Sequence, residues 1–132
     1  MDKVLSLLGL AQKAGRVEAG EDAVASATEA RRARLVLLAS DASENSVRRA
    51  RRFAEQGACL CAAVPAGKAE LGGAIGRGAC AMAAVTDIGF AEALAKKLAA
   101  IDETRYAELA QRMELKKKRA DERKNLRRAR RK

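Results

Sequence analysis

The residue types that usually carry catalysis are scarce in this chain of 132 residues. It contains no histidine, which excludes imidazole acid–base chemistry and histidine-ligated metals. Ser40, Ser43 and Ser46 have neither a histidine nor a suitably placed lysine to act as a base, so no serine nucleophile is supported. We therefore predict a protein that is not an enzyme and that needs no cofactor.

Three cysteines are the remaining candidates for metal ligands. Cys59 and Cys61 alternate along one predicted strand, and Cys80 stands at the start of another. One such pair, one remote cysteine and no histidine form a poor ligand set for zinc, and free cysteine is among the most buried residue types. We expect the thiols to pack in the core, to bind no metal and to stay reduced in the cytoplasm.

Glycine-rich segments suggest a different chemistry, contact with phosphate. The run from Leu71 to Gly78 lacks the spacing of a P-loop and does not connect a strand to a helix. Within it, Gly76-Arg77-Gly78 is either a backbone that approaches RNA closely, with Arg77 as a phosphate partner, or an ordinary tight turn. Gly20-Glu21-Asp22 either presents free N–H groups at a helix start or only caps that helix.

Positive charge is concentrated at the C-terminus. The net charge is +10; residues 1–101 hold 14 basic and 11 acidic residues, whereas residues 102–132 hold 13 and 6. From Lys116 onward there are 11 basic and 2 acidic residues and no apolar stripe, so we expect a basic arm that is disordered until it meets an anion. Its composition favours a polyanion, whose counterions it releases, over a membrane surface. Elsewhere in the chain, one predicted helix face carries three arginines that we interpret as solvent-exposed: Arg48, Arg49 and Arg52.

The scarcity of aromatic residues and the absence of export or membrane segments narrow the class of protein further. Only Phe53, Phe90 and Tyr106 are aromatic, so binding of single strands on stacking platforms is not expected. No signal peptide or transmembrane run is present, which predicts a cytoplasmic protein without a membrane partner.

An alternation of helices and short apolar strands must position these residues. We predict helices over 2–13, 20–30, 43–56, 68–75 and 88–101, and extended segments over 16–19, 35–39, 59–64 and 80–85. Leu35 to Ala39 is an unbroken apolar run, typical of a strand covered on both faces, and Asp41 with Glu44 is predicted to cap the helix that follows. The pattern predicts an α/β fold, a three-layer α/β/α sandwich with a small mixed sheet over 1–101, and a basic helical or disordered extension over 102–132.

Three segments carry a family resemblance: LLGLAQKAGRVEAGEDAV, LVLLASDASEN and LGGAIGRGACAMAAVTDIGF. In this order they resemble the bacterial YlxQ-like branch of the kink-turn-binding ribosomal protein family of the archaeal and eukaryotic large subunit. The likeness covers about residues 3 to 95 and is specific as a set. It implies an α/β/α sandwich that binds kinked, structured RNA without catalysing a reaction.

The resemblance also implies which segments contact RNA: residues 20–26, 41–43 and 76–79. Kink-turn binders typically carry an Asn–Glu pair and a Lys where this chain has Asp22, Ala23 and Ser26, and an acidic residue where it has Ser43. Arg77-Gly78 replaces the apolar pair of their last loop. The predicted RNA contacts are Gly20, Glu21, Asp22, Ser26, Asp41, Ser43, Gly76, Arg77 and Gly78, with Lys13 and Arg16 at the border and Lys116, Lys117, Lys118 and Arg119 on the arm.

Together these features predict a monomeric RNA-binding protein associated with the ribosome or another ribonucleoprotein. It would dock on kinked or bulged RNA, ribosomal or otherwise kink-turn-like, while the arm clamps neighbouring phosphates; ribosomal proteins are further candidate partners. One alternative is the RNA-recruiting module of an RNA-modification system. The other is a protein–protein adaptor whose arm becomes helical on an acidic partner.

Overall fold

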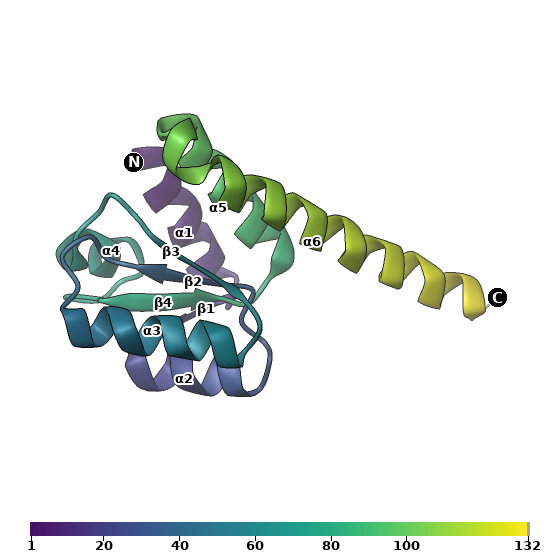
Figure 1. Ribbon diagram of the computed structural model, residues 1–132, viewed down its shortest axis with the longest axis horizontal. Helices are drawn as coiled ribbons and strands as arrows, with labels where there is room; N and C mark the ends of the chain where they lie inside the picture. Colours follow the sequence, from purple (N-terminus) through teal and green to yellow (C-terminus); the bar gives the residue numbers. More distant parts are fainter. Residues whose placement is uncertain (132) are drawn as a thin grey trace.

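A four-stranded mixed sheet separates two layers of helices in the computed structural model, which describes residues 1–131 (Figure 1). The strands are β1 (Val17–Ala19), β2 (Leu35–Leu38), β3 (Leu60–Ala63) and β4 (Met82–Val85), in the spatial order β1-β4-β2-β3. The helices are α1 (Asp2–Lys13), α2 (Glu21–Glu29), α3 (Glu44–Gln56), α4 (Lys68–Ala74), α5 (Ile88–Ile101) and α6 (Glu103–Arg130). β4 is antiparallel to both β1 and β2, whereas β2 and β3 are parallel.

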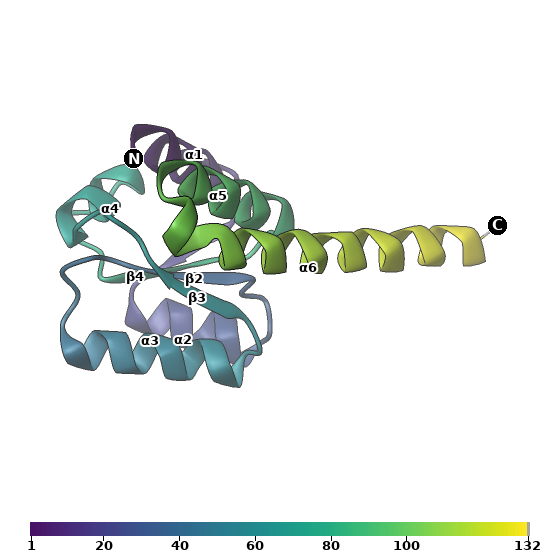
Figure 2. The ribbon, with the colours of Figure 1, turned by 45° about the horizontal axis from the view of Figure 1, so that its top comes forward.

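The central strand β2 supplies both cores, as its unbroken apolar sequence predicted. Leu35 and Leu37 face the layer that holds α1 and α5, and Val36 and Leu38 face α2 and α3 (Figure 2). All four are at most 2% exposed. Successive side chains of a strand point to opposite faces, so a strand buried on both sides must be apolar at every position. The predicted α/β/α sandwich is confirmed.

The predicted cap of α3 is wrong in detail. Ser43 is the N-cap: its Oγ accepts a hydrogen bond from the Ser46 N–H at 3.1 Å. Asp41 instead caps α4, because its Oδ1 accepts a hydrogen bond from the Lys68 N–H at 2.8 Å. β2 and β3 are parallel neighbours, so the turns that follow them lie side by side. Asp41 therefore serves a helix 27 residues further along the chain.

The segment after residue 101 is one continuous helix, so the helical form of the predicted extension is confirmed and the disorder expected from Lys116 onward is not seen among the described residues. The first half of α6 packs on α5 through Tyr106 and Met113, which are 2% and 0% exposed. The Tyr106 hydroxyl also donates a hydrogen bond to the Ala63 carbonyl at 2.6 Å and so covers part of the edge strand β3. The second half projects away from the body (Figure 1). Lys132, the last residue of the predicted arm, lies outside the described residues.

The described helices also bear on the membrane prediction. Across residues 1–131, none of them is both long enough and apolar enough to span a bilayer.

Candidate nucleic-acid interface

Three of the predicted contact segments meet at the end of the sheet where α2 and α3 begin (Figure 1). β4 is antiparallel to its neighbours, so the loop before it lies beside the turns that follow β1 and β2. The Gly20 N–H donates to the Met82 carbonyl at 3.0 Å, and the Ala39 N–H donates to the Ala81 carbonyl at 2.9 Å. We call residues 20–26, 41–43 and 76–79 together the loop surface.

Arg77 joins two parts of the loop surface. Its Nη1 donates a hydrogen bond to the Ala19 carbonyl at 2.7 Å, and its guanidinium lies against Gly20, 3.4 Å from where a Cβ on that glycine would be. Gly20 and Gly76 have φ of +95° and +78°, the left-handed region that glycine adopts most easily. Arg77 is thus a positioning residue that holds the loop before β4 on the start of α2, and it remains exposed.

The other side of the same loop is fixed by close backbone packing. A Cβ on Gly72 would lie 2.8 Å from the backbone N and Cα of Ala79, so α4 contacts the loop without any intervening side chain. A Cβ on Gly78, in contrast, would have no heavy atom within 4 Å. The loop is therefore held from behind and open on its outer face.

The electrostatics of the loop surface are mixed. Glu21 and Asp22 lie in the first turn of α2, and the Glu21 Oε1 lies 2.5 Å from the Arg49 Nη1, which ties α2 to α3. The N-cap, Gly20, has no side chain to accept from the first-turn N–H groups, which have no partner within the helix. Backbone donors and exposed side chains such as that of Ser26 suit the recognition of shape and base edges more than the neutralisation of phosphates.

The other predicted contacts lie elsewhere. Lys13, at the end of α1, lines a shallow groove with Glu70 of α4. The Arg16 carbonyl accepts from the Thr86 N–H, which places Arg16 at the opposite end of the sheet from Gly20. The predicted arm residues Lys116, Lys117, Lys118 and Arg119 also lie at that opposite end, on α6 (Figure 2). The structure therefore does not bring the arm beside the loop surface.

Sequence reasoning missed one basic cluster. At the opposite end of the sheet, α6 and the body enclose a cleft lined by Arg31, Arg34, Lys116, Arg119 and Arg123. The signal for it in the sequence is the group of arginines just before the apolar strand 35–39, namely Arg31, Arg32 and Arg34.

The cysteines are less deeply buried than predicted. Cys80 is buried and its Sγ donates to the Met82 carbonyl at 3.0 Å, whereas Cys59 and Cys61 are half-buried beside the α2–α3 core. Burial raises the pKa of each thiol, that of Cys61 to about 11, so the thiols stay protonated near neutral pH. Within residues 1–131 no three or more His, Cys, Asp or Glu side chains are grouped so as to hold a metal ion.

Comparisons with known proteins agree with this fold and with the resemblance seen in the sequence. The model of the ribosomal protein L7Ae/L30e/S12e/Gadd45 family matches residues 2–95, ending before α6. The RNA-binding protein YlxQ of Bacillus subtilis (strain 168) is 44% identical over 92 residues, which is 67% of this chain and 87% of that protein. A solved structure, a protein with unknown function from Bacillus halodurans C, superposes with a TM-score of 0.66 and 33% identity over 71% of this chain and 94% of that one.

Proposed function

The chain belongs to the ribosomal protein L7Ae/L30e/S12e/Gadd45 family, and we propose that it is a non-catalytic RNA-binding protein whose loop surface docks on structured RNA in the cytoplasm. The observation that carries this proposal is the assembly of three segments, distant in sequence, into one open surface. The Arg77–Ala19 hydrogen bond and the Gly72–Ala79 contact hold that surface in shape before any ligand arrives. The 44% identity to a protein named for RNA binding supports the same ligand class.

The proposed RNA is kinked or bulged rather than a plain duplex or an unstructured strand. Regular RNA helices hide their base edges in a deep, narrow major groove, so edges become accessible where the helix bends or bulges. The loop surface offers backbone N–H groups at the start of α2 and exposed polar side chains at Asp22 and Ser26. No aromatic residue belongs to it, which disfavours stacking of single strands. Ribosomal RNA or another RNA with a kink-turn-like bend fits this description.

We propose that the basic half of α6 adds phosphate contacts to this binding. Met113 is the last buried residue of α6 among those described, so removing residues 116–132 should leave the body folded. Affinity for RNA should fall steeply with added salt in the full chain and less steeply in the truncated one, because fewer counterions are released. An unchanged salt slope after truncation would remove α6 from the interface.

The loop surface is tested by placing a negative charge on it. Gly78→Glu introduces a carboxylate at a position where a Cβ meets nothing within 4 Å, so the fold should tolerate it. Ala100→Glu makes the same change of charge at an exposed position near the end of α5, beside the start of α1 and in the other helix layer from α2 and α3. Each variant would be titrated with a fluorescent RNA stem carrying a kink-turn loop, and with the same stem in which Watson–Crick pairs replace the loop.

We expect Gly78→Glu to weaken binding of the kinked RNA by about tenfold, the cost of one or two repelled phosphate or base contacts. Its effect on the plain stem, and the effect of Ala100→Glu on either RNA, should stay below about threefold. Equal losses for Gly78→Glu and Ala100→Glu on the kinked RNA would refute docking through the loop surface, as would equal losses for Gly78→Glu on the two RNAs.

A further inference from the structure

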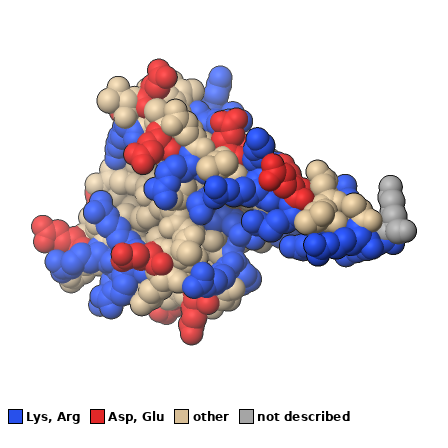
Figure 3. Space-filling model, turned by 45° about the vertical axis from the view of Figure 1, so that its right-hand side comes forward, with Lys and Arg blue, Asp and Glu red and all other residues tan. Residues whose placement is uncertain are grey.

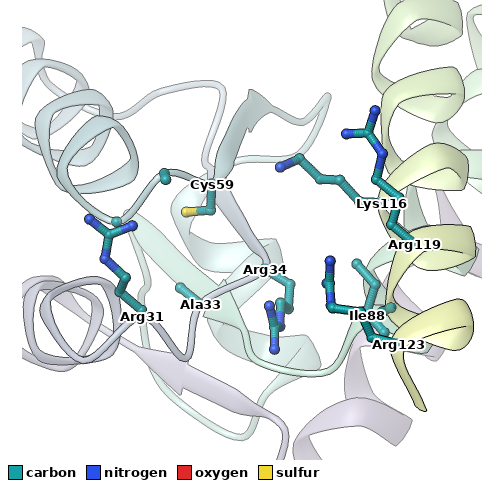
Figure 4. A pocket seen from close by; sticks show the side chains of 11 residues that line it. Arg31, Ala33, Arg34, Cys59, Ile88, Lys116, Arg119 and Arg123 are labelled. Atoms are coloured by element: carbon teal, nitrogen blue, oxygen red, sulfur yellow. The ribbon is translucent and has the colours of Figure 1, made fainter. Parts of the chain in front are cut away.

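A basic cleft lies between α6 and the body, at the end of the sheet opposite the loop surface. Its volume is about 270 Å³. Figure 4 shows α6 on one side, with the Lys116 side chain extending across the gap toward Cys59, and Arg31 of the α2–β2 turn on the other side. Arg34 lies between them, where the chain enters β2. We call this feature the α6 cleft.

The α6 cleft concentrates positive charge that nothing in it neutralises. Five cationic side chains line it, those of Arg31, Arg34, Lys116, Arg119 and Arg123, and no carboxylate does. The four salt bridges found within residues 1–131 involve none of these five. Like charges gathered at one place raise the free energy of the folded chain. Such an arrangement is therefore better suited to a bound polyanion than to the free protein.

The carboxylates in the middle of α6 lie on a different face from the cleft. Glu114, Asp121 and Glu122 line another groove together with Lys117 and Lys118, and Lys117 pairs with Asp121 at 2.7 Å. The cationic stripe of the cleft, in contrast, continues beyond the body at three- and four-residue spacing through Arg127 and Arg130. Figure 3 shows basic side chains gathered at the junction of α6 with the body and along the projecting helix. The stripe is elongated, which fits a chain of phosphates and not a single small anion.

The backbone of the body is unusual at the same place. Arg31 and Ala58 are the only non-glycine residues within residues 1–131 that have a positive φ, +58° and +54°, and both line the α6 cleft. Glycine is the usual residue in this left-handed conformation, and other residues adopt it at a cost of roughly 1 kcal/mol. Each of the two residues ends the helix before it: the Arg32 N–H donates to the Ala27 carbonyl and the Cys59 N–H to the Ala54 carbonyl, the pattern of a left-handed helix stop. Here the effect is to hold the Arg31 side chain opposite α6.

The composition of the cleft distinguishes between two classes of polyanion. An acidic protein partner would need apolar or aromatic anchors to form a stable interface core. The cleft provides only half-buried Ile88 as a large apolar contact. Four of its five cations are arginines, whose planar forks match the oxygens of phosphate. Nucleic acid backbone is thus the ligand that the observations favour.

We propose that the α6 cleft is a second RNA-binding site, separate from the loop surface, which holds the phosphodiester backbone of a further RNA segment between α6 and the arginines of the body. This goes beyond a loose electrostatic arm, because half of the site belongs to the folded body. Since the two sites lie at opposite ends of the sheet, one molecule bridges two RNA segments. Only this bridging rests on the proposed function of the loop surface; the cleft site does not.

The test compares two double charge reversals in the full-length protein. The cleft variant, Arg34→Glu with Arg119→Glu, changes one residue of the body and one of α6. The control variant, Arg48→Glu with Arg112→Glu, makes the same change of net charge at exposed positions of the body and of α6 that lie outside the cleft and outside the predicted RNA contacts. Binding of a plain RNA duplex, which lacks any kink, would be followed by fluorescence anisotropy over a series of salt concentrations.

We expect the cleft variant to lose at least about tenfold in affinity for the duplex and to reduce the salt slope by about two, because two phosphate contacts are removed. The control variant should lose less than about threefold. Reversal relieves repulsion among the cleft cations, so the cleft variant should melt no earlier than wild type. Equal losses in the two variants, or none in the cleft variant, would overturn the proposal, and so would binding of poly-glutamate by a wild-type protein that ignores the duplex.

A positional readout uses the cysteines. Cys59 lines the α6 cleft and Cys61 lies outside it, on β3. Saturating duplex RNA should slow the reaction of Cys59 with a maleimide several-fold and leave that of Cys61 unchanged; equal protection of both would overturn the assignment. Gly78→Glu should change binding of the duplex by less than about threefold. Failure of the loop surface and failure of the cleft therefore produce different results.

Discussion

Replacing Met113 with alanine tests whether α6 belongs to the same folding unit as the sandwich. The Met113 side chain is 0% exposed and packs in the core that also contains Leu94 and Leu98 of α5. Removing a buried methionine costs about 2–5 kcal/mol, and the lower half of that range applies where a helix can shift to close the cavity. For a chain of this length about 3 kcal/mol corresponds to a decrease in Tm of roughly 10 °C.

The assay is thermal and urea denaturation followed by circular dichroism. Leu115→Ala is the matched control, because Leu115 lies two residues away on the same helix but is 47% exposed. Its truncation should change stability by no more than about 0.5 kcal/mol. A chain that ends at Ile101, the predicted boundary of the body, should lose more than Met113→Ala does, since it uncovers the α5 face that α6 covers. If that truncated chain or Met113→Ala melts as wild type does, α6 is an appendage and this reasoning fails.

Three further predictions follow from local geometry. Gly72→Ala should destabilise the protein by about 1–3 kcal/mol, because the added Cβ would lie 2.8 Å from the backbone of Ala79. Gly73→Ala is the control in the same helix: its Cβ would have nothing within 4 Å, so it should stabilise the protein by about 0.5–1 kcal/mol. Equal shifts in Tm for the two variants would contradict the packing of α4 on the loop. Burial raises the pKa of Cys61 to about 11, so less of its thiolate is present at pH 8. Iodoacetamide should therefore label Cys61 at least about tenfold more slowly in the folded than in the urea-unfolded protein, and the labelling rate of the folded protein should still rise above pH 9. A labelling rate that reaches a plateau at pH 9 would contradict this prediction. Asp41→Ala should lower the free energy of unfolding by about 1 kcal/mol, because α4 loses its cap. Asp41→Asn keeps an acceptor oxygen and should lose only part of this stability. An unchanged Tm in Asp41→Ala would show that another group caps α4.

The two proposed RNA-binding surfaces differ in charge, which changes how salt effects on this protein are to be interpreted. The loop surface carries Glu21 and Asp22 among its donors, whereas the α6 cleft carries cations alone. Added salt should therefore weaken the binding of a plain duplex more than the discrimination between kinked and plain RNA. Specificity and affinity are assigned to opposite ends of one sheet.

Much of the fold was determined by local sequence pattern. The unbroken run from Leu35 to Ala39 identified the central strand, because only a strand covered on both faces needs apolar residues at every position. Helical periodicity located the five helices of the body. Gly15, directly after the C-cap of α1, has the left-handed φ of +73° that a glycine at this place in the sequence favours. The family resemblance then identified the three segments of the loop surface, which periodicity alone does not select.

Other features depended on contacts between distant residues and were decided by the tertiary structure. Asp41 stands beside the start of α3 in the sequence, yet it caps α4, because parallel pairing of β2 with β3 brings the two turns together. The sequence left Arg77 as either a phosphate partner or part of a tight turn, and only the structure shows its hydrogen bond to the Ala19 carbonyl. Tyr106 and Met113 bury themselves against α5 and β3, and their helical spacing is visible in the sequence; the surfaces that they cover are decided by the tertiary structure.

The sequence by itself determined that a basic segment exists, and only the tertiary structure decided where it lies. Net charge is additive along the chain and is therefore visible without a fold. The partners of a charge depend on which segments meet in space, and here α6 leaves the body at the end of the sheet opposite the loop surface. It lies there against Arg31 and Arg34, which come more than eighty residues earlier in the chain. The basic residues of α6 therefore line one side of a cleft, because α6 passes the end of the sheet at which β2 begins.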